Sequence, residues 1–469
     1  MIIAIFVLIA LGLLGLGASV FWSNRHPEPL WDWSTIDTSD VEFPAGFLWG
    51  SATASHQVDG GNDNNNWARW EQSFDEKGQP RVHNGDSAGA AAEHWDRYPE
   101  DIARMREDLG LNSYRFSIEW SRVEPEKGRF DPEAIAHYHG MIDALIAAGI
   151  APMITLHHFT NPLWFEDMGA FEKEENIAHF VAFSCRMFEE FGSKVQRWCT
   201  INESGPYAVM GYGLGVFPPG VKNFRRMALV LYHLMRAHTA VYEAIKGMPG
   251  GDTVDVGLVK NIFQFDPYSR WNPFHWVLCR VADGAYNQSI IGYLKEGRFR
   301  VRIPLLVNLD RHHPNDAGKS DFVGLNYYAN LILSLFMKRQ PPFEPHARPG
   351  QILTDMPYAI YAEGFHSALM RLKPLDLPII VTENGIADDK DDRRALWIRR
   401  YLYAMSRAIE EGADVRGYHY WSLIDNFEWA EGWQMAFGLY ENNRETQERR
   451  LREGSLAYRD AVAQWSNND

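Results

Sequence analysis

The sequence contains little cysteine and an excess of negative charge. Among 469 residues there are only three cysteines, Cys185, Cys199 and Cys279, and no CxxC pair. These counts exclude a disulfide framework and a cysteine-rich zinc site. Lys and Arg total 46 against 61 Asp and Glu, so the net charge is −15. Because an acidic surface repels phosphate backbones, we expect no nucleic-acid partner.

No charged residue occurs between Ile2 and Trp22, and this stretch is apolar apart from Ser19. At the rise of an α-helix it spans about 30 Å, the thickness of a hydrocarbon core. We therefore predict that residues 1–23 form a transmembrane anchor. The alternative is a signal sequence, although the basic start typical of a signal is missing. Arg25 follows the span, which favours a single-pass protein with a cytoplasmic catalytic side.

Residues 24–42 contain two prolines and scattered acidic residues, which predicts a linker. Residues 43–469 show no break in composition and are expected to form one catalytic domain. In this domain apolar runs alternate with amphipathic stretches, the pattern of a single (β/α)8 TIM barrel preceded by the N-terminal hydrophobic helix. The strands are expected at Leu48–Ala52, Ser113–Ile118, Ala151–His157, Arg197–Asn202, Val254–Asn261, Phe322–Asn326, Ile379–Glu383 and Gly417–Ser422. Helices are expected at Pro99–Leu109, Pro132–Gly149, Ile177–Phe191, Arg225–Ile245 and Arg394–Glu411.

Most of these strands end in polar or aromatic residues, whereas buried parallel strands are usually apolar throughout. In a barrel the carboxyl ends of the strands meet at one mouth, where active sites are built. Glu203 follows the fourth strand and Glu383 ends the seventh, so we expect these two carboxyl groups to face each other. Two opposed carboxyl groups are the minimum for cleaving a glycosidic bond. Arg115, in the second strand, is a candidate to keep one of them ionised.

Five sequence motifs resemble glycoside hydrolase family 1, the β-glucosidase family, and the likeness runs from about Phe43 to Tyr440. They are FPAGFLWGSATASHQ at 43–57, YRFSIEWSR at 114–122, TINE at 200–203, VTENG at 381–385 and WSLIDNFEW at 421–429. Each short motif is weak by itself. Their occurrence in the family's order makes the resemblance specific.

The resemblance implies a retaining, exo-acting β-glycosidase with Glu203 as general acid/base and Glu383 as nucleophile. Retention requires a separation of roughly 5–5.5 Å between the two carboxyl groups. It further implies that Arg115, Tyr328 and Asn326 orient the nucleophile. The residues implied for binding the terminal sugar are Gln57, His158, Asn202, Trp421, Glu428 and Trp429. The expected substrates are β-D-glucosides, with galactosides or fucosides as further candidates. Glu428 argues against a 6-phosphorylated sugar, because a carboxylate would repel the phosphate.

Two other functions remain open on the sequence. A transglycosidase would pass the same sugar intermediate to a sugar or lipid acceptor, and a membrane anchor would suit a glycolipid substrate. A catalytically inactive sugar-binding protein is the second alternative, but such family members typically lack one of the two glutamates. No cofactor or metal is expected, since no three-ligand cluster with metal spacing occurs. The sequence departs from the family pattern at Ser204, Asp59, Phe159 and Ala436. These positions lie around the outer part of the sugar site and the side that binds the aglycone or acceptor, so they leave the aglycone open.

Overall fold

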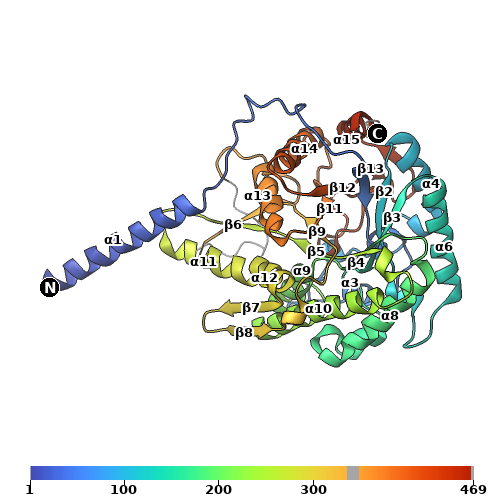
Figure 1. The fold of residues 1–469 in the computed structure, drawn as a ribbon, viewed down its shortest axis with the longest axis horizontal. Helices are drawn as coiled ribbons and strands as arrows, with labels where there is room; N and C mark the ends of the chain where they lie inside the picture. Colours follow the sequence, from blue (N-terminus) through green and yellow to red (C-terminus); the bar gives the residue numbers. More distant parts are fainter. Residues whose placement is uncertain (1, 335–347, 466–469) are drawn as a thin grey trace.

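The computed structural model describes residues 2–334 and 348–465. Its centre is a closed barrel of eight parallel strands, with neighbours in the order β1-β12-β11-β9-β5-β4-β3-β2 (Figure 1). The strands are β1 (Leu48–Ala52), β2 (Ser113–Ser117), β3 (Ala151–His157), β4 (Arg197–Ile201), β5 (Asp255–Asn261), β9 (Phe322–Asn326), β11 (Ile379–Asn384) and β12 (Val415–Trp421). The predicted (β/α)8 barrel is confirmed.

Helices surround this barrel (Figure 1). The longer ones are α4 (His94–Ala103), α6 (Pro132–Ala147), α8 (Ile177–Phe191), α10 (Phe224–Lys246), α11 (Pro273–Asp283), α12 (Ser289–Glu296), α13 (Ala362–Leu372), α14 (Arg394–Glu410) and α15 (Leu456–Trp465). Short helices follow strand ends or lie in loops: α2 (Ser55–Val58), α3 (Asn66–Glu71), α5 (Trp120–Val123), α7 (Leu163–Asp167) and α9 (Ser204–Ala208).

Three two-stranded sheets lie outside the barrel. They pair β6 (Gln264–Pro267) with β10 (Asn330–Leu333), β7 (Arg298–Ile303) with β8 (Val307–His312), and β13 (Tyr440–Asn442) with β14 (Arg449–Leu451). Because β6 comes shortly after β5 and β10 shortly after β9, the first of these sheets is an extension at the carboxyl-terminal end of the barrel.

The prediction was wrong at the start of the first barrel helix. Pro99 was expected near its beginning, but α4 starts at His94 and contains Pro99. Proline has no N–H, so the carbonyl of Trp95 loses its usual helical donor. The Nε2 atom of His137 lies 2.8 Å from that carbonyl oxygen and provides a replacement contact. The tertiary contact therefore allows a proline inside this helix.

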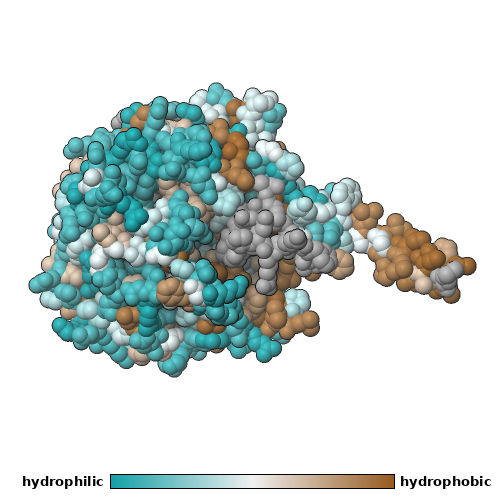
Figure 2. Space-filling model, turned by 180° about the vertical axis from the view of Figure 1, so that it is seen from behind, coloured by the Kyte–Doolittle hydropathy of each residue, from teal (hydrophilic) through white to brown (hydrophobic). Residues whose placement is uncertain are grey.

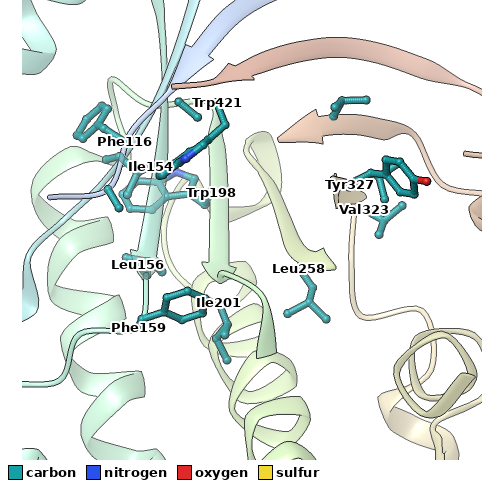
Figure 3. Close-up of a cluster of buried hydrophobic side chains, with 14 of the residues drawn as sticks. Phe116, Ile154, Leu156, Phe159, Trp198, Ile201, Leu258, Val323, Tyr327 and Trp421 are labelled. Carbon is teal, nitrogen blue, oxygen red and sulfur yellow. The ribbon is translucent and has the colours of Figure 1, made fainter. Parts of the chain in front are cut away.

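Large apolar side chains on neighbouring barrel strands pack against the surrounding helices. Phe116 of β2 stacks on Tyr138 of α6, and Trp198 of β4 contacts the ring of Phe188 of α8. Figure 3 draws Phe116 and Trp198 together with Ile154 of β3 and Leu258 of β5. Trp198, Ile154 and Leu258 are completely buried. This packing holds the strand ends in fixed positions, which a site assembled from several strands requires.

The predicted N-terminal hydrophobic helix is present as α1 (Ile2–Arg25), and it projects away from the barrel (Figure 1). Figure 2 shows continuous hydrophobic surface along it. By length and composition α1 is able to cross a membrane, a property that it shares with signal sequences. After α1 the chain lies along the barrel, where Trp31 N and Trp33 Nε1 each donate a hydrogen bond of 3.0 Å to Glu363 of α13.

Candidate active site

Glu203 and Glu383 both lie at the carboxyl-terminal ends of barrel strands. Glu383 belongs to β11, and Glu203 follows Asn202 directly after β4. Their side chains are buried, with 8% of Glu203 and 4% of Glu383 exposed. Glu203 has φ = 45°, a left-handed conformation that is uncommon for a residue with a side chain. Such strain occurs mostly at functional sites, where the surroundings hold it in place.

Glu383 is held by a cation and a phenol. Arg115 Nη1 donates to Glu383 Oε1 at 2.7 Å, and the Tyr328 hydroxyl donates to Oε2 at 2.9 Å. The guanidinium is completely buried and also donates from Nη2 to Asn202 Oδ1 at 2.8 Å. Burial raises the pKa of Glu383 above its usual value, and Arg115 and Tyr328 make this rise smaller. The carboxylate form of Glu383 is therefore less disfavoured than it would be by burial alone.

Glu203 lies in a different electrostatic environment. Asn326 Nδ2, from the end of β9, donates to Glu203 Oε1 at 2.9 Å and lies 3.2 Å from Asn202 Oδ1. The Thr382 hydroxyl donates to Asn326 Oδ1 at 2.7 Å and fixes the orientation of this amide. A neutral amide compensates a carboxylate less than a guanidinium does. Burial and repulsion by Glu383 accordingly raise the pKa of Glu203 to about 8.

Polar groups for a sugar converge beside the two glutamates. Gln57 Nε2 donates to the Phe427 carbonyl at 2.7 Å and to Glu428 Oε2 at 3.3 Å. The amide of Asn426 donates to the same Glu428 oxygen at 2.8 Å. Burial is the main cause that raises the pKa of Glu428 to about 8. The Oε1 atom of Gln57 is buried and has no hydrogen-bond partner among the described residues. A hydroxyl of a bound ligand would satisfy it.

His158 lies between the sugar-binding candidates and the catalytic pair. Its Nε2 atom is 3.0 Å from Asn202 Nδ2, and since an amide nitrogen only donates, Nε2 accepts and Nδ1 carries the proton. In the described part of the chain Nδ1–H has no acceptor. Burial and Arg115 lower the pKa of His158, so the ring is neutral. It stacks at 5.8 Å on Trp421 and at 6.1 Å on Trp429.

All residues predicted for the site thus lie in one connected region. Asn202 links Arg115, His158 and Asn326, and through them both glutamates. The region combines a carboxyl group held by a guanidinium, a second carboxyl group whose pKa is raised to about 8, unsatisfied polar atoms and indole rings. Indole faces stack on the apolar faces of sugars, and amides and carboxylates bind hydroxyls. This arrangement is suited to breaking a glycosidic bond.

The comparisons with known proteins agree with this chemistry. The sequence profile described as glycosyl hydrolase family 1 matches residues 39–467. Beta-glucosidase A of Thermotoga maritima is 30% identical over 463 residues, covering 90% of this chain and 98% of the relative. A 1,4-beta-D-glucan glucohydrolase of Thermotoga neapolitana is also 30% identical, covering 90% of this chain and 98% of the relative. The chain belongs to glycosyl hydrolase family 1.

Solved structures of family members share the fold. The beta-glycosidase from Pyrococcus horikoshii superposes with a TM-score of 0.79 at 34% identity, covering 92% of this chain and 99% of that one. The Thermotoga maritima beta-glucosidase in complex with glucoimidazole gives a TM-score of 0.81 at 29% identity, covering 90% and 99%. Membership of glycosyl hydrolase family 1 confirms the predicted enzyme class, a retaining β-glycosidase. The whole of α1 precedes the residues that the family profile matches.

Three residues of this family 1 site were missed by the sequence reasoning. Lys260 and Asn261 end β5, and Tyr286 donates from its hydroxyl to Asn261 Oδ1 at 2.7 Å. Lys260 is 1% exposed, its Nζ lies 4.2 Å from the centre of the Tyr286 ring, and it donates to the Asn261 carbonyl. Burial lowers the pKa of Lys260 to about 7. A lysine in an otherwise apolar parallel strand was the available signal.

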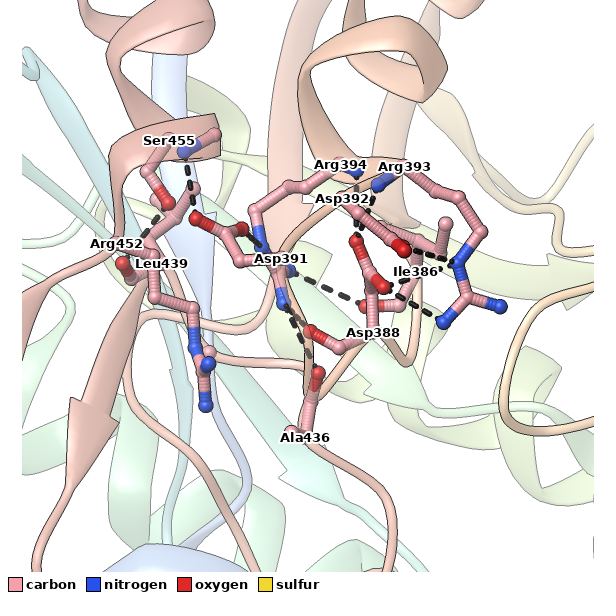
Figure 4. Close-up of polar contacts among 12 residues, drawn as sticks. Ile386, Asp388, Asp391, Asp392, Arg393, Arg394, Ala436, Leu439, Arg452 and Ser455 are labelled. Carbon is pink, nitrogen blue, oxygen red and sulfur yellow. Dashed lines mark hydrogen bonds and ion pairs between the residues drawn. The ribbon is translucent and has the colours of Figure 1, made fainter.

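A buried arginine supports the loops around the nucleophile strand. Arg394, at the start of α14, donates from Nη1 to the Ile386 and Phe437 carbonyls and from Nη2 to those of Asp388 and Ala436. Figure 4 shows it at the centre of these contacts, next to the Asp388–Arg393 pair. These hydrogen bonds connect the chain after β11 with the chain after Trp429. Both segments border the site.

Proposed function

We propose that Glu203 is the general acid/base and Glu383 the nucleophile of a β-glucosidase-like hydrolase. The observation that carries this assignment is the contrast between the two carboxyl groups. Arg115 contacts Glu383 directly, whereas Glu203 interacts with two amides, Asn326 and Asn261, and with Lys260. These partners do not outweigh burial and the repulsion of Glu383, which raise the pKa of Glu203. At neutral pH Glu203 then holds a proton for the leaving oxygen while Glu383 is ionised for attack on the anomeric carbon.

The reaction would proceed in two displacements. In the first, the Glu383 carboxylate bonds to the anomeric carbon as the Glu203 proton passes to the departing oxygen. In the second, Glu203, now ionised, takes a proton from water, and the water oxygen replaces the Glu383 ester bond with net retention. Asn202, which contacts Arg115 and His158, would hydrogen-bond the sugar next to the reacting carbon. Tyr328 and Arg115 keep the nucleophile oriented.

The substrate is proposed to be a terminal, unphosphorylated β-D-glucosyl residue. Gln57, His158 and Glu428 present an acceptor, a donor and a carboxyl group for adjacent hydroxyls, and Trp421 and Trp429 offer ring faces. The relatives named above are a beta-glucosidase and a glucan glucohydrolase, which supports glucose over other hexoses. Transfer to a sugar or lipid acceptor is not favoured by these similarities.

Two variants test the assignment with aryl β-glucosides. Glu383→Ala is expected to lose turnover and to recover it with azide, giving a glucosyl azide of inverted configuration. Glu203→Ala is expected to hydrolyse only substrates with very good leaving groups. Near-normal turnover by Glu383→Ala would overturn the nucleophile assignment. Product analysis with added glycerol or glucose as acceptor separates hydrolysis from transfer.

We further propose that α1 is retained and anchors the enzyme in a membrane, with the catalytic domain on the cytoplasmic side. The proposal is supported by an uninterrupted apolar run, by its exposure along Ile2–Leu14 and by Arg25 at its end. Membrane fractions should contain the full-length chain with its original N-terminus. Protease added to intact cells or spheroplasts should leave the catalytic domain uncut. A mature chain starting after Gly17 would show instead that the segment is a cleaved signal.

A further inference from the structure

One side of α1 packs against the catalytic domain well before the helix ends. Gly15, Ala18, Ser19, Trp22 and Ser23 are its less exposed residues, and their spacing places them on one face. This face contacts α11. A Cβ atom added to Gly15 would lie 3.4 Å from Pro273 Cγ, and Ser19 is completely buried. At its end, Arg270 donates to the Ser23 hydroxyl at 2.9 Å.

The position of this contact limits how α1 can cross a bilayer. The part of α1 that extends freely, Ile2–Leu14, measures only about 20 Å at the rise of an α-helix. A hydrocarbon core is about 30 Å thick. A span must therefore include residues from Gly15 to about Phe21, which is 53% exposed on the side away from the domain. The part of α11 that contacts Gly15 must then lie at the depth of the acyl chains.

The side chains that are exposed at the start of α11 are suited to the depth of the acyl chains. Trp271 is 69% exposed, Phe274 63% and Val277 45%, and their spacing of three residues puts them on one side of the α11 start. We call these three residues the α11 docking face. Between Tyr268 and Ala282 the sequence has no Asp or Glu and contains two arginines, although the whole chain carries a net charge of −15. Aromatic residues flanked by arginine are typical of membrane interfaces.

We propose that the α11 docking face inserts into the same lipid bilayer that α1 spans, so that the catalytic domain rests on the membrane instead of being tethered at a distance. This inference rests on the proposed anchoring by α1. Because α11 packs on β6 and β10, the docked side lies beside the carboxyl-terminal end of the barrel. The rim of the active site that follows β5 and β9 would consequently lie close to the lipid headgroups (Figure 1).

The test uses the full-length protein in vesicles of phosphatidylcholine and phosphatidylglycerol. Phe274→Cys is labelled with an environment-sensitive fluorophore in a Cys185→Ser background, since Cys199 and Cys279 are buried. The matched control is Ile146→Cys, since Ile146 is 45% exposed and belongs to α6. Figure 1 shows α6 on the side of the barrel far from α1. The Cys185→Ser variant without an introduced cysteine reports any labelling of the remaining thiols. Lipids with a spin label just below the headgroup serve as quenchers.

We expect the label at position 274 to shift to shorter wavelength and to lose roughly half of its emission to the quencher, as an interfacial depth of about 5–10 Å requires. The label at position 146 should show neither effect.

Flotation of the same samples with the vesicles reports anchoring independently. If the protein floats but position 274 is quenched no more than position 146, docking is overturned and anchoring stands. If the protein fails to float, both are overturned. Hydrolysis of a soluble aryl glucoside, measured in parallel, tests the catalytic assignment separately.

Discussion

Replacing Glu383 by Gln removes a buried negative charge beside Glu203 while keeping the size of the side chain. Repulsion by Glu383 is one of the two causes that raise the pKa of Glu203 to about 8, the other being burial. The variant therefore leaves burial unchanged and isolates the repulsion. In the proposed mechanism the same change of charge takes place when Glu383 becomes an ester. The variant would then imitate the charge of the proposed glycosyl-enzyme.

The size of the effect follows from Coulomb's law. Two unit charges at the separation of a retaining pair, about 5.5 Å, interact by about 3 kcal/mol at an effective dielectric constant of about 20. Since 1.36 kcal/mol corresponds to about one pKa unit, the pKa of Glu203 should fall by about 2, from about 8 to about 6. Glu203 would then be an acid at pH 7 in the free enzyme and a base in the intermediate.

Carbon-13 NMR of protein labelled at the glutamate carboxyl carbon measures this pKa directly. Glu203→Gln identifies the resonance by its disappearance. Glu363→Gln is the control, because Glu363 is equally buried but belongs to α13 and contacts Trp31 and Trp33. The control should leave the pKa of Glu203 unchanged. A pKa in Glu383→Gln within about 0.5 of the wild-type value would refute the electrostatic account of the pair.

Three further outcomes are expected. Gln57→Leu should lower kcat/KM for aryl glucosides about 10–100-fold, the loss expected when hydrogen bonds to a buried ligand are removed, with an unchanged circular dichroism spectrum. Lys260→Met should raise the free energy of urea unfolding at pH 7 by about 1–4 kcal/mol. Burial lowers the pKa of Lys260 to about 7, so the wild type gains stability as the pH rises from 7 toward 10.5. The difference in unfolding free energy between the variant and the wild type should therefore shrink over that range. Asp101→Asn should cost about 3–5 kcal/mol, because Asp101 is completely buried between His94 and Arg449. Burial alone would raise its pKa, but these partners lower it, so the loss of stability should be full at neutral pH. It should begin to shrink near pH 3.8 and vanish only as the pH falls through the lower pKa of Asp101 in the folded protein.

The strands and the two glutamates were predictable because each leaves a local signal. The start of β1 at Leu48 and the end of β9 at Asn326 agree with the pattern of apolar runs ended by polar residues. The environment of Lys260 was not predictable in this way. Its Tyr286 neighbour comes from a segment after α11, and a ring packed over a lysine leaves no mark in the spacing of either residue. The same holds for Pro99, whose tolerance depends on His137 of another helix.

The difference between the two glutamates is likewise a tertiary property. Each of them lies at the end of an apolar strand, and only the family resemblance, not the composition of the two motifs, indicates which one is the acid. The distinction arises because the barrel places Arg115 of β2 within 2.7 Å of Glu383 and gives Asn326 of β9 to Glu203. Asn202 then accepts from both Arg115 and Asn326, so that moving either donor would disturb both carboxyl groups. The left-handed backbone at Glu203 fits this reasoning, since a strained residue persists only where several such contacts fix it.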